Sequence, residues 1–136
     1  MAGKKILLVD DEPSVIKVVK RRLETQGYTV VVAADGVEGL EKAMAETPDL
    51  IISDVMMPDL DGYSMIKALR AKPQFAKTPV IVLTAKDKLQ DLFHFEGVAD
   101  MDYIVKPFET EVLLEKIAQL MKRVQSHLTP PPETAA

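Results

Sequence analysis

Five short runs of apolar and β-branched residues recur along the chain, and they constrain the fold more than any other feature of the sequence. They are residues 6–9, 29–32, 50–53, 80–83 and 103–105. Each run has the length and composition of a β-strand. Three of the runs are apolar throughout, as a strand must be when both faces of its sheet are covered. The chain is therefore predicted to form a largely parallel sheet between two layers of helices.

The segments between these runs have the apolar spacing of amphipathic helices. Pro13 begins the first helix, where a missing N–H costs nothing, and Val15, Val19 and Leu23 follow on one face. The apolar faces predicted for the later helices are Val37, Leu40 and Met44; Met65, Ile66 and Leu69; Leu89, Leu92 and Phe93; and Leu113, Ile117, Leu120, Met121 and Val124. Alternation of strands and helices predicts the α/β class, with a three-layer, doubly wound (βα)5 domain and right-handed crossovers.

The length and composition of the chain limit the kinds of function it can have. Its 136 residues are enough for one domain, which we expect over residues 1–125, followed by a Pro-rich tail or linker over 126–136 that we expect to be disordered. The absence of cysteine excludes thiol catalysis and Cys-ligated zinc. The net charge of −4 gives no general reason to bind nucleic acid, and no apolar run is long enough for membrane insertion. We therefore expect a cytoplasmic protein whose function resides in a local site.

Chemically active side chains follow four of the five predicted strands. Asp10 and Asp11 follow the first strand, and Asp54 follows the third. Thr84 follows the fourth strand and Lys106 the fifth. Binding crevices of open parallel sheets lie beyond the carboxyl ends of the strands, so these side chains are predicted to share one crevice. Taken singly, Asp11 is as well explained as a helix cap and Thr84 as an ordinary strand residue.

The predicted crevice contains more negative charge than one lysine can balance. Three carboxylates with no His or Cys nearby favour a hard divalent cation, and Mg²⁺ fits best because it accepts both carboxylate and phosphate oxygens. A cation, an ammonium and a hydroxyl around one carboxylate can hold a phosphoryl group. Asp54 lies centrally in the predicted sheet and is the predicted nucleophile, since Asp carboxylates form aspartyl-phosphates.

Four separated motifs resemble the receiver domain of two-component response regulators, of the stand-alone, chemotaxis-regulator type. They are Leu7-Leu8-Val9-Asp10-Asp11-Glu12, Asp54-Val55-Met56-Met57-Pro58-Asp59-Leu60-Asp61-Gly62, Thr84-Ala85 and Lys106-Pro107-Phe108. The resemblance implies a flavodoxin-like strand order of 2-1-3-4-5. It also implies that Asp54 accepts the phosphoryl group, and that Asp10, Asp11, Asp54 and the backbone carbonyl of Met56 hold Mg²⁺. Lys106 then pairs with the phosphate, while Thr84 and Tyr103 are the switch residues.

The same resemblance implies the partners and the type of activity. The phosphoryl donor is expected to be a histidine kinase or a histidine phosphotransfer protein, and the phosphorylated form is expected to bind an unknown output protein. Phosphorylation and dephosphorylation of Asp54 are self-catalysed only, so the protein is not expected to be a conventional enzyme. We expect a monomer, or a weak dimer that depends on phosphorylation, without direct nucleic-acid binding.

One enzymatic alternative uses a similar set of residues. Haloacid-dehalogenase-like phosphatases also combine a strand-end Asp, a Thr, a Lys and Mg²⁺. That chemistry needs a second Asp two residues after the nucleophile as the general acid, and this chain has Met56 there. The alternative is therefore disfavoured.

Overall fold

A computed structural model describes residues 4–55, 61–95 and 100–128 of the chain. It contains a sheet of five strands: β1 (Lys5–Val9), β2 (Thr29–Ala33), β3 (Leu50–Asp54), β4 (Val80–Ala85) and β5 (Met101–Lys106). The spatial order is β2-β1-β3-β4-β5, and every neighbouring pair is parallel. The predicted strands, their parallel arrangement and their order are all confirmed.

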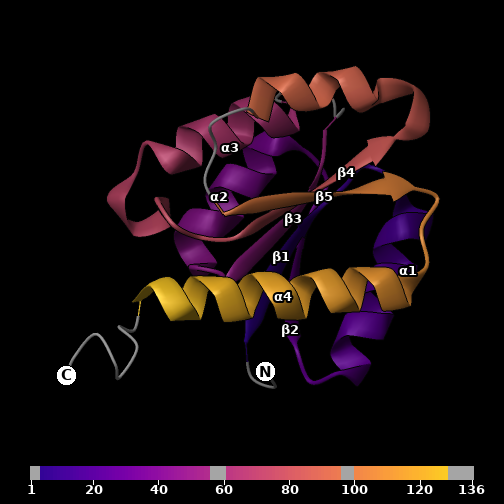
Figure 1. Cartoon of the computed structure of the whole chain (residues 1–136), viewed down its shortest axis with the longest axis horizontal. Coiled ribbons are helices and arrows are strands. Elements are labelled where there is room, and N and C mark those ends of the chain that lie inside the picture. Colours follow the sequence, from indigo (N-terminus) through magenta and orange to yellow (C-terminus); the bar gives the residue numbers. More distant parts are fainter. Residues whose placement is uncertain (1–3, 56–60, 96–99, 129–136) are drawn as a thin grey trace.

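Helices cover both faces of the sheet (Figure 1). The helices α1 (Pro13–Thr25) and α4 (Thr110–Leu128) lie on one side, and α2 (Gly36–Glu46), α3 (Gly62–Arg70) and the 3₁₀ segment η2 (Lys86–Phe95) lie on the other. A short 3₁₀ turn, η1 (Pro73–Phe75), follows α3. Alternate residues of β1 therefore enter different cores: Ile6 and Leu8 pack with α1 and α4, while Leu7 and Val9 pack with the opposite layer. Burial on both faces explains why the central strands are apolar throughout.

Of the apolar face predicted for α2, Leu40 packs partly buried against the core, whereas the other two residues do not. Val37 and Met44 are 48% and 46% exposed, and the buried residues of α2 are Gly36, Gly39 and Ala43. A Cβ at Gly39 would lie 2.5 Å from Met65 Sδ and 3.3 Å from both methyl groups of Val9. The missing side chain lets the α2 backbone lie close to β1 and α3, so the small residues, together with Leu40, form the contact face.

Two further predictions differ from the structure. The segment predicted as the fourth helix forms 3₁₀ turns, interrupted by the non-helical backbone of Lys88 (φ −115°, ψ 18°), rather than a regular α-helix. Of its predicted apolar face, Leu89 is exposed and Leu92 packs partly buried against the core, while the side chain of Phe93 lies outside the described ones. The last helix runs to Leu128, three residues past the predicted boundary of the tail; residues 129–136 lie outside the described ones.

Local sequence signals explain where the helices begin. Asp35 accepts a hydrogen bond from the backbone N–H of Glu38 at the start of α2, and the Glu38 carboxylate accepts one from the N–H of Ala34. The pairing resembles a capping box, except that Glu38 accepts from the residue before the N-cap Asp35 rather than from Asp35 itself. Asp61 caps α3 by accepting from the N–H of Ser64. Among the described residues, none of the helices combines the length and apolar character that a bilayer crossing needs.

Candidate functional site

The parallel sheet brings four predicted site residues to one edge. Asp10 follows β1 directly, and Asp54 is the last residue of β3. Thr84 is the penultimate residue of β4, and Lys106 ends β5. The register sets Asp54 opposite Leu83 and Thr84 opposite Val105, so the functional side chains lie within one residue of each other along neighbouring strands. These residues line or adjoin one cavity of about 340 Å³, whose lining includes Asp11, Asp54, Thr84 and Lys106.

Four carboxylates gather at this edge. One oxygen from each of Asp10, Asp11, Glu12 and Asp54 lies within 4.8 Å of the others. Asp10 is fully buried and Asp54 nearly so, whereas Asp11 and Glu12 face solvent. The predicted acids are therefore brought together, and the structure adds Glu12. Sequence reasoning missed Glu12 as a member of the site, although it directly follows the two aspartates.

The alternative role of Asp11 as a helix cap does not hold. The N-cap of α1 is Glu12, and no side chain caps the helix there. The backbone N–H of Glu12 instead donates to Asp10 Oδ1 at 2.9 Å. This bond fixes the Asp10 carboxylate and leaves its other oxygen directed at Lys106.

Lys106 joins three of the carboxylates. Its Nζ lies 2.8 Å from Glu12 Oε1, 3.0 Å from Asp10 Oδ2 and 3.1 Å from Asp54 Oδ2. Burial by itself would lower the pKa of the ammonium, but the hydrogen bonds to Glu12 and Asp10 and the charge of Asp54 raise this pKa well above its usual value of 10.5. Lys106 is therefore held protonated, and it links the ends of three strands.

The backbone around Asp54 is tightly packed. The Ser53 hydroxyl donates to the carbonyl of Asp54 at 2.9 Å. Gly62, at the start of α3, lies against the same carbonyl, and a Cβ there would overlap the Asp54 oxygen. The N–H of Gly62 also donates to the carbonyl of Val55. The motif that resembles receivers thus places glycine where α3 meets the strand that presents Asp54.

The two predicted switch residues occupy different environments. Thr84 is buried, and its hydroxyl lies 3.4 Å from the carbonyl oxygens of Ala85 and Lys88, a distance that makes both hydrogen bonds weak. Tyr103 is 42% exposed, and the ammonium of Lys116 lies 5.5 Å from the centre of its ring. Thr84 lines the acidic cavity, whereas Tyr103 lines a different one, between β5 and α4. Met56, predicted to offer its carbonyl, lies outside the described residues.

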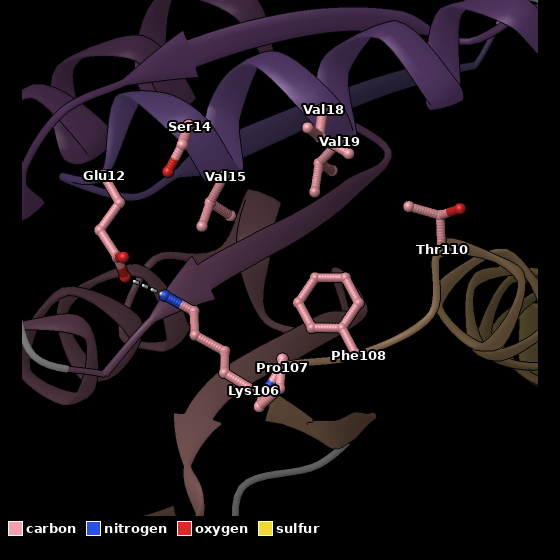
Figure 2. A pocket seen from close by; sticks show the side chains of 9 residues that line it. All are labelled: Glu12, Ser14, Val15, Val18, Val19, Lys106, Pro107, Phe108 and Thr110. Carbon is pink, nitrogen blue, oxygen red and sulfur yellow. Dashed lines mark hydrogen bonds and ion pairs between the residues drawn. The ribbon is translucent and has the colours of Figure 1, made fainter.

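A second, more apolar cavity of about 510 Å³ adjoins the site (Figure 2). Val15, Val18 and Val19 of α1 line one side, and Phe108 faces them from the segment after β5. Glu12 and Lys106 line both this cavity and the acidic one. Their ion pair is thus part of the wall between the two.

The sequence and the fold were compared with those of known proteins. The family model of the response regulator receiver domain matches residues 6–118. The alkaline phosphatase synthesis transcriptional regulatory protein PhoP of Bacillus subtilis is 44% identical over 122 residues, which are 89% of this chain and 50% of that protein. The DNA-binding dual master transcriptional regulator RpaA of Synechocystis is 39% identical over 120 residues, which are 88% of this chain and 49% of that protein. The chain thus spans about half the length of these curated relatives.

Two solved structures resemble the whole fold. The chemotaxis response regulator CheY4 of Vibrio cholerae has a TM-score of 0.80 and 38% identity, covering 88% of this chain and 98% of that one. The receiver domain of sensor histidine kinase PA1611 from Pseudomonas aeruginosa has a TM-score of 0.81 and 33% identity, covering 89% of this chain and 99% of that one. The latter contains a magnesium ion coordinated in its active site cleft.

These matches decide between the two functional classes raised by the sequence. The phosphatase alternative finds no support in them. The family model spans most of the chain, and the observed strand order agrees with the solved structures. The chain therefore belongs to the response regulator receiver domains of two-component systems, which are signalling domains rather than conventional enzymes.

Proposed function

We propose that Asp54 accepts a phosphoryl group from the phosphohistidine of a histidine kinase or a histidine phosphotransfer protein. The observation that carries this proposal is the position of the Asp54 carboxylate at the end of β3, where it lines the acidic cavity. Its Oδ2 atom lies 3.1 Å from Lys106 Nζ. A carboxylate oxygen forms the new P–O bond while the P–N bond to the donor imidazole breaks, and the imidazole leaves with the electron pair. Lys106 balances charge on the phosphoryl oxygens.

The donor set fits Mg²⁺. The cluster offers four carboxylates, which are oxygen ligands, and the ammonium of Lys106 contacts three of them. Asp10, Asp11 and Asp54 would hold the ion, together with the backbone carbonyl of Met56. When bound, the ion supplies positive charge between the carboxylates and the incoming phosphoryl group.

The phosphoryl group is proposed to switch the surface beside β4 and β5. Its oxygens offer the Thr84 hydroxyl a stronger acceptor than the two carbonyls 3.4 Å away. Movement of Thr84 then alters η2 and the space available to Tyr103. The changed surface binds an output protein, without direct contact to nucleic acid.

Several further properties belong to the same proposal. The receiver acts through contacts of its own surface, either as a stand-alone regulator, which the match to 98% of the CheY4 chain supports, or as the receiver of a longer regulator, which the match to about half of PhoP supports. Both phosphorylation and hydrolysis of Asp54 are self-catalysed, and the domain works in the cytoplasm, where it meets its phosphoryl donor. It is a monomer, or a weak dimer when phosphorylated.

The test is intact-mass spectrometry after incubation with acetyl phosphate and Mg²⁺. The wild type should gain one phosphoryl group, and Asp54→Asn should gain none. Asp61→Asn is the matched control, because Asn caps a helix as well as Asp does, and it should be phosphorylated normally. A modification that persists in Asp54→Asn, or that resists hydroxylamine, would assign the chemistry to another residue.

A further inference from the structure

Glu12 makes the shortest of the three contacts of Lys106, yet neither the fold nor the proposed phosphotransfer assigns it a role. The Lys106 ammonium has three N–H donors, and each has a carboxylate acceptor: Asp10, Glu12 and Asp54. A phosphoryl group at the site therefore finds no unused donor on Lys106. For the ammonium to bind its oxygens, an existing contact must be given up.

The three contacts differ in what their loss would cost. The Asp10 side chain has no exposed surface, so water cannot take the place of the ammonium at its carboxylate. Asp54 is itself the residue that carries the phosphoryl group. The Glu12 side chain is 54% exposed, so water can solvate its carboxylate after release. Of the three contacts of Lys106, the one with Glu12 therefore has the lowest free-energy cost of breaking.

The short distance between the Glu12 and Asp54 carboxylates, and the charge that phosphorylation adds, also favour the release of Glu12 from Lys106. Oxygens of Glu12 and Asp54 already lie within 4.8 Å of one another while Asp54 carries a single negative charge. A phosphoryl group adds oxygens and further negative charge at that position, so repulsion with the Glu12 carboxylate increases. A Glu12 carboxylate that stayed on Lys106 would face this group across one shared ammonium.

We infer that Glu12 is the resting-state counterion of Lys106, a positioning residue whose carboxylate leaves the ammonium when Asp54 carries a phosphoryl group. Glu12 therefore opposes phosphorylation, because the phosphoryl group must compete with it for Lys106. This inference rests on the proposed phosphorylation of Asp54. Figure 2 shows the pair at the rim of the apolar cavity, where the Glu12 side chain extends from the start of α1 toward Lys106. The exchange thus removes the ion pair that separates the two cavities.

The test uses beryllofluoride as the phosphoryl mimic, with the dissociation constant measured by NMR titration. Mg²⁺ affinity is determined first for each variant, so that every titration is run at saturating Mg²⁺. Glu12→Gln should bind beryllofluoride about 2- to 5-fold more tightly than the wild type, the effect expected of a half-exposed ion pair. Glu111→Gln is the matched control, since Glu111 pairs with Arg22 away from the cavity, and its dissociation constant should not change.

A second variant separates the contact from the charge. Glu12→Asp keeps the negative charge but is one methylene shorter, so it loses reach to Lys106, and it should also bind beryllofluoride more tightly. A dissociation constant equal to the wild type in both variants, or a change in Glu12→Gln alone, would overturn the inference. The ¹³C signal of the Glu12 carboxylate should also shift on adding beryllofluoride, while that of Glu111 stays. If the wild type and Asp54→Asn bound beryllofluoride equally, the proposed function would fail, and the inference with it.

Discussion

At the scale of single residues, the site is a set of charges arranged around one ammonium. Lys106 lies 94 positions from Glu12 and 52 from Asp54 in the sequence, yet it contacts both. Asp11 belongs to the carboxylate cluster, its side chain is exposed, and it does not cap α1. Each of these residues can therefore be tested by a separate property: metal affinity for Asp11 and pH dependence for Lys106.

Asp11→Ala should weaken Mg²⁺ binding and slow phosphorylation by acetyl phosphate together. Removal of a direct oxygen ligand should lower the Mg²⁺ affinity by at least about tenfold, since even outer partners of metal ligands have effects of that size. Isothermal titration calorimetry measures the affinity. Glu41→Ala removes an exposed carboxylate on α2 and is the control. Unchanged Mg²⁺ affinity in Asp11→Ala would remove Asp11 from the proposed ligands.

The raised pKa of Lys106 predicts how stability depends on pH. Folding favours the protonated ammonium, so its contribution is fully present below the usual pKa of 10.5 and is lost as the pH rises above it toward the folded-state pKa. The free energy of unfolding of the wild type should therefore fall more steeply above about pH 10.5 than that of Lys106→Met. Between about pH 7 and about pH 9 the difference between the two should stay constant. Urea denaturation across this range measures it, and parallel curves would show that the ion pairs do not hold the proton.

At the scale of the elements, the short distance between a helix and the sheet, more than the size of its apolar side chains, determines which residues form the contact. The large side chains Val37 and Met44 of α2 face outward, while Gly39 lies against Met65 and Val9. The same principle operates at Gly62, where α3 meets the Asp54 carbonyl. Glycine is needed at both positions because another backbone or side chain occupies the space of a Cβ.

Substitutions in α2 should therefore reverse the order that hydrophobicity alone predicts. Gly39→Leu should lower the free energy of unfolding by about 1–3 kcal/mol, because the new side chain overpacks the contact with β1. Val37→Ala, at an exposed position, should change it by less than about 0.5 kcal/mol. Urea denaturation gives both values. A larger loss in Val37→Ala than in Gly39→Leu would restore the predicted apolar face.

At the scale of the whole molecule, the site lies at the carboxyl ends of the strands, at one edge of the sheet that separates the two helical layers. Lys106 links the ends of β1, β3 and β5, and Thr84 contributes from β4 between them. The hydroxyl of Thr84 also contacts the carbonyl of Lys88, the residue that interrupts η2. A change at Asp54 can thus reach a segment outside the sheet by shifting the balance between two arrangements of Thr84.

Beryllofluoride should perturb the backbone NMR signals of η2 and Tyr103 more than those of α2. In Thr84→Ala the mimic should still bind, but the distant shifts should shrink by at least about half, because the hydroxyl that links the two regions is missing. Thr84→Ser keeps the hydroxyl and should restore them. Undiminished shifts in Thr84→Ala would show that another element carries the change.

Sequence periodicity determined the five strands, their parallel pairing and the edge that holds the site. Runs that are apolar throughout require burial on both faces, and parallel strands present their carboxyl ends together. The sequence alone therefore predicts that five residues are neighbours: Asp10, Asp11, Asp54, Thr84 and Lys106. The switching role of Tyr103 came from the family resemblance alone, and it stays a prediction.

Only the tertiary structure decided which side chains meet across that edge. The contact between Glu12 and Lys106 depends on the reach of two long side chains from distant segments, and no local pattern encodes it. The contact face of α2 depends on how closely a helix can approach the sheet, which a pattern of large apolar residues does not measure. The apolar spacing of residues 86–95 likewise predicts a regular helix, but the segment forms 3₁₀ turns. The non-helical backbone of Lys88 interrupts them. Periodicity reports which residues can be buried, whereas distances between segments decide which of them are.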